Sequence, residues 1–265
     1  MIKGAILYFS LTGNTKLACE YIKATVKDAD FELIDIKTAP NDLSSYDMVG
    51  FATYSEGFSI CKYVKDYIAG LKHADDTPAF VFSTFGRNNG ATTAVLARWA
   101  TRAGFKVVAD YALHTPENHP PTIRHDQSYE NSPSKQEMDG FTGFIGSLSA
   151  ICRRIGLGEA IAPKEVAVKR VYKMIPELNR PAFNRRMIGK KLVDTKRCIQ
   201  CGRCAKACNY HAITMKKFPA FEEQNCHGCW ACYNLCPAKA IYTKSFNQFG
   251  NYPRPSKHMR ETLKV

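Results

Sequence analysis

The sequence contains no apolar run near the roughly 18 residues that a membrane-spanning helix needs, although 45% of its 265 residues are hydrophobic. The apolar stretch at its start, Met1–Ser10, is too short for the core of a signal peptide. Charged residues make up 23% of the chain, which is an ordinary share and excludes wholesale disorder. These absences predict a cytoplasmic globular protein with one large domain or two modest ones.

Acidic residues are scarce in the C-terminal part of the chain. Residues 159–265 contain 21 Lys and Arg but only 7 Asp and Glu, whereas residues 1–158 contain 16 and 17. Cysteine has the same bias, since eight of the eleven lie between Cys198 and Cys236. In a reducing compartment, such cysteines bind metal more often than they form disulfides. We therefore expect a neutral N-terminal domain and a basic, cysteine-rich C-terminal part.

Short apolar runs alternate with helical patterns over residues 1–158. This alternation is typical of an α/β fold with a doubly wound parallel sheet of five strands. Gly140, Gly143 and Gly146, on the last helix, predict close contact between that helix and the sheet. The expected strands are 2–9, 31–36, 48–53, 79–83 and 105–113, and the expected helices are 15–26, 63–71, 91–103 and 134–155.

Three polar loops follow expected strands, at the sheet edge where such folds bind ligands. The loop 10–15 places hydroxyl and backbone N–H groups at a helix N-terminus, which suits a phosphate; an ordinary turn with a threonine cap is the alternative. The loops 53–58 and 83–90 combine aromatic residues with glycine, which suits a flat ring. The candidate binding residues are Ser10, Thr12, Gly13, Asn14, Thr15, Thr53, Tyr54, Ser55, Glu56, Gly57, Thr84, Phe85, Gly86, Arg87, Asn89 and Gly90.

The first loop, Ser-Leu-Thr-Gly-Asn-Thr at 10–15, fits the S/T-x-T-G-N-T phosphate loop of the flavodoxin family, which residues 1–158 resemble. The resemblance implies non-covalently bound FMN, with its phosphate in this loop and its isoalloxazine ring between the other two. Tyr54 resembles a residue that stacks on the ring, and Phe85 is the alternative; packing in the core is the other interpretation of both. Glu56 near a flavin would disfavour an anionic reduced form.

The clustered cysteines form two copies of the motif C-x2-C-x2-C-x3-C, and residues 190–245 resemble a bacterial-type ferredoxin with two [4Fe–4S] clusters. A zinc site would have paired C-x2-C units with a longer separation. The three isolated cysteines, Cys19, Cys61 and Cys152, are expected as small buried residues. Because the fourth cysteine of each motif ligates the other cluster, the expected ligand sets are Cys198, Cys201, Cys204 and Cys236 for one cluster and Cys208, Cys226, Cys229 and Cys232 for the other.

A basic connector, 159–189, and a basic tail, 246–265, complete the chain, and the tail is expected to lie over the surface. An amphipathic helix is expected at 166–175. The basic residues have three interpretations: a solvated face that balances cluster charge, a docking surface for an acidic redox partner, or nucleic-acid binding, for which no recognised module is present. Within the basic stretch 159–197, these residues are Lys169, Arg170, Lys173, Arg180, Arg185, Arg186, Lys190, Lys191, Lys196 and Arg197.

The whole chain resembles the flavodoxin–ferredoxin fusions of the EFR family of iron–sulfur flavoproteins, which implies electron transfer between protein partners in anaerobic metabolism. A flavin exchanges one or two electrons and a cubane one, so the expected function is a redox relay. The alternative is an enzyme in which FMN reduces a quinone, a nitro compound or oxygen, with Tyr54, Glu56, Arg87, His114 and His119 as candidate proton donors. A third class of function is a role in assembly or regulation, in which the clusters would only support the structure and transfer no electrons. The oligomeric state stays open, a homodimer included.

Overall fold

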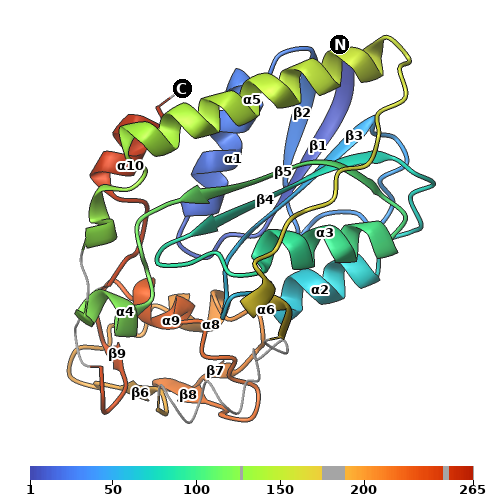
Figure 1. The fold of residues 1–265 in the computed structure, drawn as a ribbon. Helices are drawn as coiled ribbons and strands as arrows, with labels where there is room; N and C mark the ends of the chain where they lie inside the picture. The colour runs from blue at the N-terminus through green and yellow to red at the C-terminus, as the bar shows by residue number, and fades with distance from the viewer. Residues whose placement is uncertain (126–127, 175–188, 247–250, 265) are drawn as a thin grey trace.

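The computed structural model describes residues 1–125, 128–174, 189–246 and 251–264. Its larger part is a five-stranded, wholly parallel sheet with helices on both faces (Figure 1). The spatial order β2-β1-β3-β4-β5 is the flavodoxin-like order of a doubly wound sheet, so the predicted fold class is confirmed. The strands are β1 (Ile2–Tyr8), β2 (Ala29–Asp35), β3 (Met48–Tyr54), β4 (Pro78–Phe85) and β5 (Lys106–His114).

Two separate hydrophobic cores lie on the two faces of the sheet. Helices α1 (Asn14–Thr25) and α5 (Lys135–Gly156) cover one face, and α2 (Lys62–Ala69) and α3 (Thr92–Arg102) cover the other. Successive side chains of a strand point to opposite faces. In β4, accordingly, Phe80 and Phe82 enter the first core while Val81 enters the second. Burial on both faces explains why these strands are continuously apolar in sequence.

Helix α5 begins with a capping box: Ser134 Oγ accepts from the backbone N–H of Glu137, whose carboxylate accepts from Ser134 N at 2.7 Å. Gly140 lies close to the sheet, since a Cβ there would be 2.9 Å from the Tyr111 hydroxyl. The prediction was wrong for Gly143 and Gly146, which are exposed and have nothing within 4 Å of an added Cβ. The buried stripe of α5 is instead formed by Phe141, Phe144, Ile145, Leu148 and Cys152.

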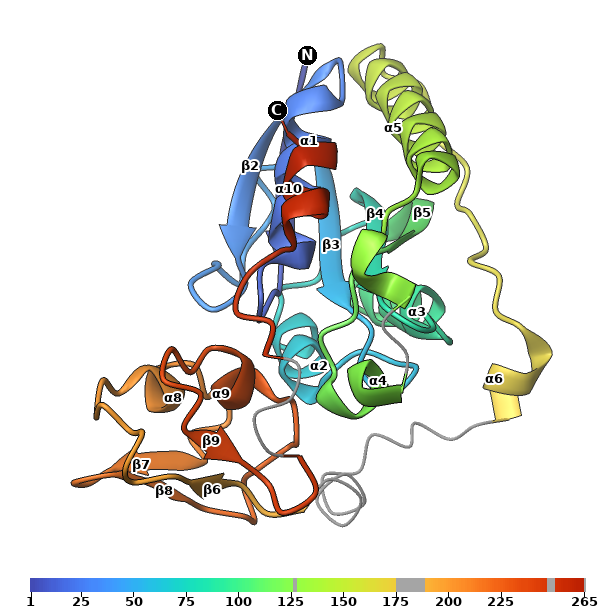
Figure 2. The ribbon, with the colours of Figure 1, turned by 90° about the vertical axis from the view of Figure 1, so that its left-hand side faces the viewer.

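The cysteine-rich part is small and has two approximate repeats. Strand β6 pairs with β9, and β7 with β8, both antiparallel. Figures 1 and 2 place this part beside the edge of the parallel sheet where the strands end. Its core is formed around Trp230, Tyr233 and Ile241. The elements are β6 (Leu192–Val193), α8 (Arg203–Lys206), β7 (Ile213–Met215), β8 (Pro219–Phe221), α9 (Ala231–Asn234) and β9 (Ile241–Tyr242).

The tail returns to the parallel-sheet part rather than remaining on the surface. Helix α10 (Lys257–Thr262) lies beside α1 in Figure 2. Its Met259, together with Leu263, is fully buried in the same core as α1 and α5. The prediction that the tail lies over the surface is therefore wrong for these two residues. They are four residues apart and so lie on the same face of the helix, although most of their neighbours in the sequence are polar or basic. The cysteine-rich part is inserted between two segments that pack together.

The connector also packs on the sheet part. Lys164 donates its backbone N–H to Val107 O and pairs with Asp110 at 2.7 Å. The helix expected at 166–175 is shorter in the structure, where α6 spans Arg170–Met174, and residues 175–188, with Arg180, Arg185 and Arg186, lie outside the described residues. The remaining short helices are α4 (Pro120–His125) and η1 (Ser128–Asn131).

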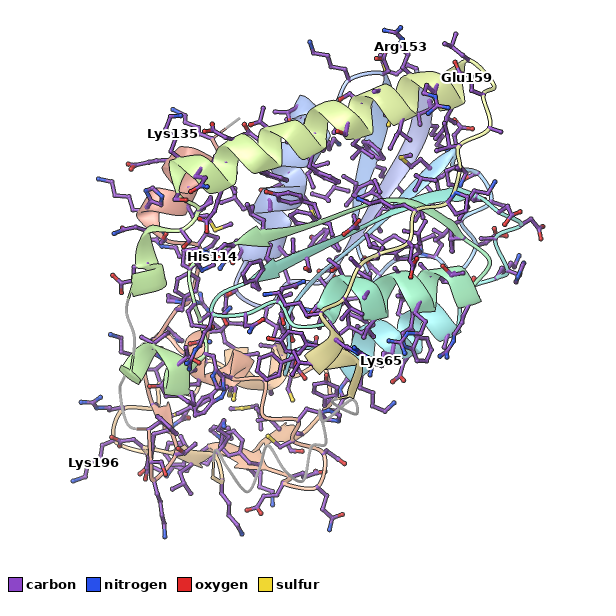
Figure 3. All side chains as sticks on the ribbon, in the orientation of Figure 1. Lys65, His114, Lys135, Arg153, Glu159 and Lys196 are labelled. Carbon is purple, nitrogen blue, oxygen red and sulfur yellow. The ribbon has the colours of Figure 1, made fainter. Side chains whose placement is uncertain are left out.

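Charged side chains cover both ends of the molecule. Lys135 and Arg153 project from α5, and Lys196 projects from the cysteine-rich part at the opposite end (Figure 3). Within residues 1–125, 128–174, 189–246 and 251–264, no helix is both long enough and apolar enough to cross a bilayer. Cys19, Cys61 and Cys152 are fully buried, as expected from their isolation in the sequence.

Candidate functional site

The loop 10–15 makes a tight turn between β1 and α1. Gly13 precedes α1 with a φ of 100°, a left-handed conformation that favours glycine, and its N–H donates to Ser10 Oγ at 3.1 Å. A Cβ at Gly13 would lie 2.9 Å from Cδ of Pro255 in the tail. Thr12, Asn14 and Thr15 are buried. The turn thus brings hydroxyls, an amide and helix N–H groups together under a covering segment.

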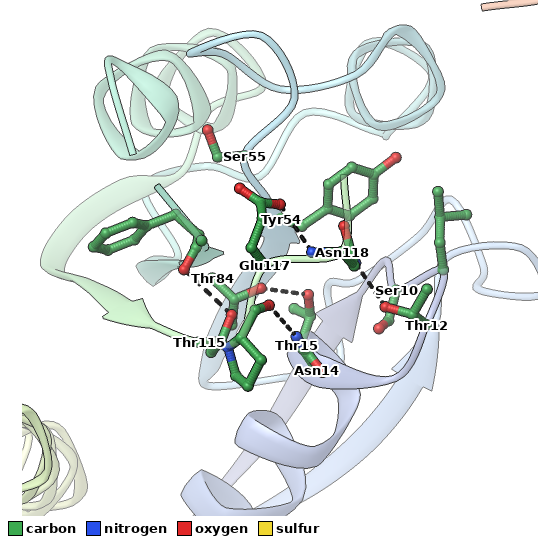
Figure 4. Close-up of a pocket in the computed structure, with 14 residues that line it drawn as sticks. Ser10, Thr12, Asn14, Thr15, Tyr54, Ser55, Thr84, Thr115, Glu117 and Asn118 are labelled. Carbon is green, nitrogen blue, oxygen red and sulfur yellow. Dashed lines mark hydrogen bonds between the residues drawn. The ribbon is translucent and has the colours of Figure 1, made fainter. Parts of the chain in front are cut away.

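A small hollow of about 30 Å³ opens beside this loop (Figure 4). The hydroxyls of Thr15 and Thr84 lie 2.8 Å apart and join the first predicted loop to the third. The loop after β5 is a fourth wall, of which the sequence pointed only to His119 as a candidate residue. Asn118 donates from Nδ2 to Thr12 Oγ1 at 2.7 Å, and Pro116 O accepts from Asn14 Nδ2 at 3.0 Å. Its position after the fifth strand, at the same sheet edge, was the available signal.

A second hollow, of about 610 Å³, lies next to the first and is bounded by both parts of the molecule. The second and third predicted loops contribute Tyr54, Ser55, Glu56, Gly57, Phe58, Gly86, Arg87 and Asn88, and the loop after β5 contributes Glu117, Asn118, His119 and Thr122. The cysteine-rich part contributes Gly228, Cys229 and Trp230. A predicted cluster ligand therefore lies on the wall of the space between the predicted ring-binding loops.

Tyr54 lines both hollows and Phe85 only the smaller one. The Tyr54 ring packs against Phe9 with centroids 5.8 Å apart, and its hydroxyl donates to Glu56 Oε2 at 2.9 Å. Burial, followed by the nearby charge of Glu56, raises the pKa of Tyr54 well above its usual value of 10. Phe85 stacks on His114 at 5.2 Å. Tyr54 is therefore held neutral at the junction of the two spaces.

Other predicted residues shape the loops without lining either hollow; they are Gly13, Thr53, Asn89 and Gly90. Asn89 accepts from Ser83 Oγ at 2.7 Å, and a Cβ on Gly90 would be 2.4 Å from Cβ of Phe58. His114 is turned toward α5, where it pairs with Glu137 at 2.6 Å. Of the candidate proton donors, Tyr54, Glu56, Arg87 and His119 border the larger hollow and His114 does not.

The eight cysteines of the two motifs separate into two groups. A small hollow of about 20 Å³ is lined by Cys198, Cys201, Cys204 and Cys236, which we call the outer set because Cys201 is exposed. Cys208, Cys226, Cys229 and Cys232 are the inner set. Besides burial, Cys232 and Cys208 both raise the pKa of Cys229, and Cys226 and Cys208 both raise that of Cys232, as expected for thiols gathered at one site. Each fourth cysteine is thus found with the three cysteines of the other motif.

The two sets have matching backbone contacts. Ala212 donates its N–H to Cys208 Sγ at 3.3 Å, and Ala240 donates to Cys236 Sγ at the same distance. Burial raises the pKa of Cys204 and raises that of Cys232 to about 12, so both thiols need a compensating charge to be held as thiolates. The iron of a bound cluster supplies such a charge.

Tyr210, two residues after Cys208, is a partly buried tyrosine of the cysteine-rich part that is close enough to the sheet part for Glu56 and Cys61 to affect its pKa. Its ring stacks on His227 at 3.7 Å. Burial raises its pKa, with further contributions from Glu56 and Cys61 of the sheet part and from Cys229. The repeat did not point to a role for Tyr210, because the second repeat has Ala238 at the equivalent position.

Comparison with known proteins agrees with this division. The family model "4Fe-4S dicluster domain" matches residues 191–243. Ferredoxin-3 from Nostoc sp. is 35% identical over 71 residues, which cover 19% of this chain and 72% of the relative. An uncharacterised ferredoxin from Methanocaldococcus jannaschii is 34% identical over 58 residues, or 20% of this chain and 75% of the relative. The prediction of two [4Fe–4S] clusters is thus confirmed.

Part of this chain is also similar to solved structures of other proteins. A flavodoxin from the domain Archaea has a TM-score of 0.42 and 14% identity, over 57% of this chain and 99% of its own. Rubredoxin oxygen:oxidoreductase from Desulfovibrio gigas has a TM-score of 0.45 and 18% identity, over 58% of this chain and 36% of its own. The flavodoxin-like assignment of the first part rests on its strand order. The chain belongs to the ferredoxins with a 4Fe–4S dicluster domain, joined here to a flavodoxin-like domain in one polypeptide.

Proposed function

We propose that this chain is an electron relay in which FMN, the inner cluster and the outer cluster follow one another from the sheet edge to the surface. The observation that carries the proposal is the larger hollow, whose wall combines the predicted ring loops with Cys229 of the inner set. A flavin ring in that space would lie directly beside a cluster ligand. Single electrons pass between two redox centres more readily when the centres lie closer together.

The residues of the first domain fit FMN. Hydroxyls of Ser10, Thr12 and Thr15, with helix N–H groups, suit the phosphate. Tyr54 and Glu56 offer an aromatic face and an acceptor where the ring would lie. Bound FMN would supply the one- and two-electron chemistry that joins a cluster to other redox partners.

We propose that the outer set is the port for a protein partner. Cys201 is exposed, and the neighbouring Ile199 is 65% exposed. Exposed basic side chains of Lys196, Arg197 and Arg203 surround this point and suit an acidic redox protein. From the family resemblance, we propose that such partners act in anaerobic metabolism. Reduction by an acidic ferredoxin should slow as salt rises from 0.05 to about 0.5 M, because surface attraction is screened over ~10 Å at 0.1 M; a salt-independent rate would contradict this port.

The reduction of a small acceptor at the flavin is the second candidate function. The size of the larger hollow, and the presence of Arg87 and His119 on its wall, favour it. Steady turnover of a quinone or a nitro compound with reduced ferredoxin as donor, well above the rate of free FMN, would support this enzyme. Turnover no faster than free FMN would leave the relay between proteins as the function.

The decisive experiment is anaerobic purification followed by an absorbance spectrum and counts of iron, sulfide and flavin. We expect about eight irons, about eight sulfides and one FMN per chain. Freeze-quench spectra after reduction of the clusters should show the flavin reduced in the same molecules. A folded protein that holds clusters but no flavin, or a flavin that stays oxidised beside reduced clusters, would overturn the relay.

A further inference from the structure

Lys191 is a buried lysine at the start of the dicluster domain. Its exposed fraction is 7%, whereas lysines are almost never buried unless they are paired. Its ammonium group lies 3.7 Å from the centroid of the Trp230 ring, in cation–π geometry. Trp230 is itself 2% exposed and lies on the wall of the larger hollow. Two buried side chains thus hold a positive charge next to the inner set.

The charges that face Lys191 are cysteines of the inner set. Desolvation lowers the pKa of Lys191, and Cys232, then Cys226 and Cys229, act in the opposite direction and favour its charged form. Burial lowers the pKa of the neighbouring His119, and Lys191 also lowers it. Conversely, Lys191 is the main charge that favours the thiolate of Cys232. Among the described residues, no carboxylate forms an ion pair with Lys191. Its electrostatic partner is therefore the inner cluster site.

The outer set has a different environment. The charges that act on Cys204 come from Cys236 and Cys198, and Cys201 is exposed to solvent. On the flavin side of the inner set, Glu56 acts on Cys229 with the opposite sign to Lys191. The two cluster sites, which the sequence repeat makes nearly equivalent, thus differ in charge and in exposure.

We propose that Lys191 is the built-in counter-charge of the inner cluster and sets its reduction potential above that of the outer cluster. A fixed cation in a poorly solvated site favours the added electron, because Coulomb interactions are much stronger there than in water. The outer cluster is screened by solvent and gains less. The difference in potential between the two clusters would favour movement of each electron inward, from the port to the cluster beside the flavin. Only this last consequence rests on the order of centres in the proposed function.

The test is an EPR-monitored redox titration of the anaerobic, cluster-loaded full chain. Lys191→Met keeps the aliphatic stem on Trp230 and removes the charge. We expect the equilibrium for sharing an electron between the clusters to shift toward the outer one by at least about tenfold, which is about 59 mV for a one-electron couple. Lys190→Met is the matched control: Lys190 pairs with Glu223 at 2.9 Å and its side chain is 73% exposed, so we expect less than a twofold shift.

Further variants assign and challenge the effect. Cys201→Ala should lose only the outer cluster, so the potential that remains in this variant belongs to the inner cluster. Lys191→Arg, which keeps a positive charge, should have the inner-cluster potential of the unmodified protein. Equal shifts of both clusters in Lys191→Met, no shift, or an Arg variant that behaves like Met would overturn the proposal. If Lys191→Met and Lys191→Gln lose inner-cluster iron while Lys191→Arg keeps it, the counter-charge is supported; loss in all three indicates packing alone and overturns it. These potentials can be measured without FMN, so a failure of the relay is distinguishable.

Discussion

The hydroxyl of Tyr252 donates a hydrogen bond to Oδ1 of Asn14 at 3.0 Å, although 238 residues separate the two in the chain. Tyr252 also donates its backbone N–H to Oδ1 of Asn234 on α9, and Asn234 Nδ2 donates to the carbonyl of Asn118. Asn118 in turn donates to Thr12. A series of hydrogen bonds therefore connects the predicted phosphate loop to α9, the helix that carries the predicted cluster ligand Cys232.

Tyr252→Phe should weaken FMN binding without loss of iron. The variant removes the donor to Asn14 and the acceptor for Ser256 N, at 2.8 Å. At about 1 kcal/mol for such a bond, the dissociation constant of FMN should rise about fivefold or more. Fluorescence titration of flavin-free protein measures it, with Tyr242→Phe in β9 as the control. An unchanged dissociation constant would show that the tail does not support the phosphate loop.

Cys204→Ser should remove about half of the iron and leave the flavin in place. Cys204 lines the hollow of the outer set, whereas Cys229 of the inner set borders the larger hollow. Iron, sulfide and flavin counts on anaerobic protein test this, and Cys19→Ala, in the buried core of the sheet part, is the control. Loss of both cofactor types in equal measure from a folded variant would contradict two independent cofactor sites.

The converse change is Thr12→Val together with Asn14→Val, which should remove the flavin and retain about eight irons. Both side chains are buried at the smaller hollow and donate or accept hydrogen bonds there. The same cofactor counts measure the outcome. Retention of stoichiometric FMN in this double variant would place the phosphate elsewhere.

Glu56→Gln should make bound FMN easier to reduce. The Glu56 carboxylate lines the larger hollow, and a negative charge there opposes negative charge on the reduced ring. The two-electron potential should rise, by about 30 mV for each tenfold change in the equilibrium. A spectroscopic redox titration measures it, with Glu20→Gln on the surface of α1 as the control. A fall in the potential would exclude Glu56 as a charge close to the ring.

Met259→Ala should destabilise the flavodoxin-like domain by about 2–5 kcal/mol, the usual cost of truncating a buried methionine. Met259 is fully buried in the core of α1 and α5. Urea unfolding followed by tryptophan and flavin fluorescence measures the change. Leu157→Ala, at a side chain that is 68% exposed, should have almost no effect. Equal effects of the two substitutions would mean that the tail packs only loosely.

The sequence predicted most of the fold because the relevant signals are local. Each expected strand of the parallel sheet lies within two residues of the observed one at either end, since a strand buried on both faces is a continuous apolar run bounded by polar loops. The motif spacing likewise predicted two [4Fe–4S] clusters, which the family match confirms. Gly143 and Gly146 were misjudged because small residues at three-residue spacing occur on an exposed face as readily as at a contact.

What the sequence did not predict depends on contacts between distant segments. Asn118 and Tyr252 are ordinary polar residues in loops, and only the folded chain brings them to Thr12 and Asn14. Lys191 was one of many basic residues in a charged stretch, and its burial under Trp230 cannot be read from composition. The burial of Met259 was concealed in the same way by its basic neighbours.

The return of α10 to the first core has a consequence for biosynthesis. A ribosome makes α1 and α5 long before it makes Met259 and Leu263, and it must complete both cysteine motifs in between. The core of the flavodoxin-like domain therefore lacks Met259 and Leu263 until both cysteine motifs have been synthesised. Pro255, just before α10, can therefore cover Gly13 of the predicted phosphate loop only after both cysteine motifs have been synthesised.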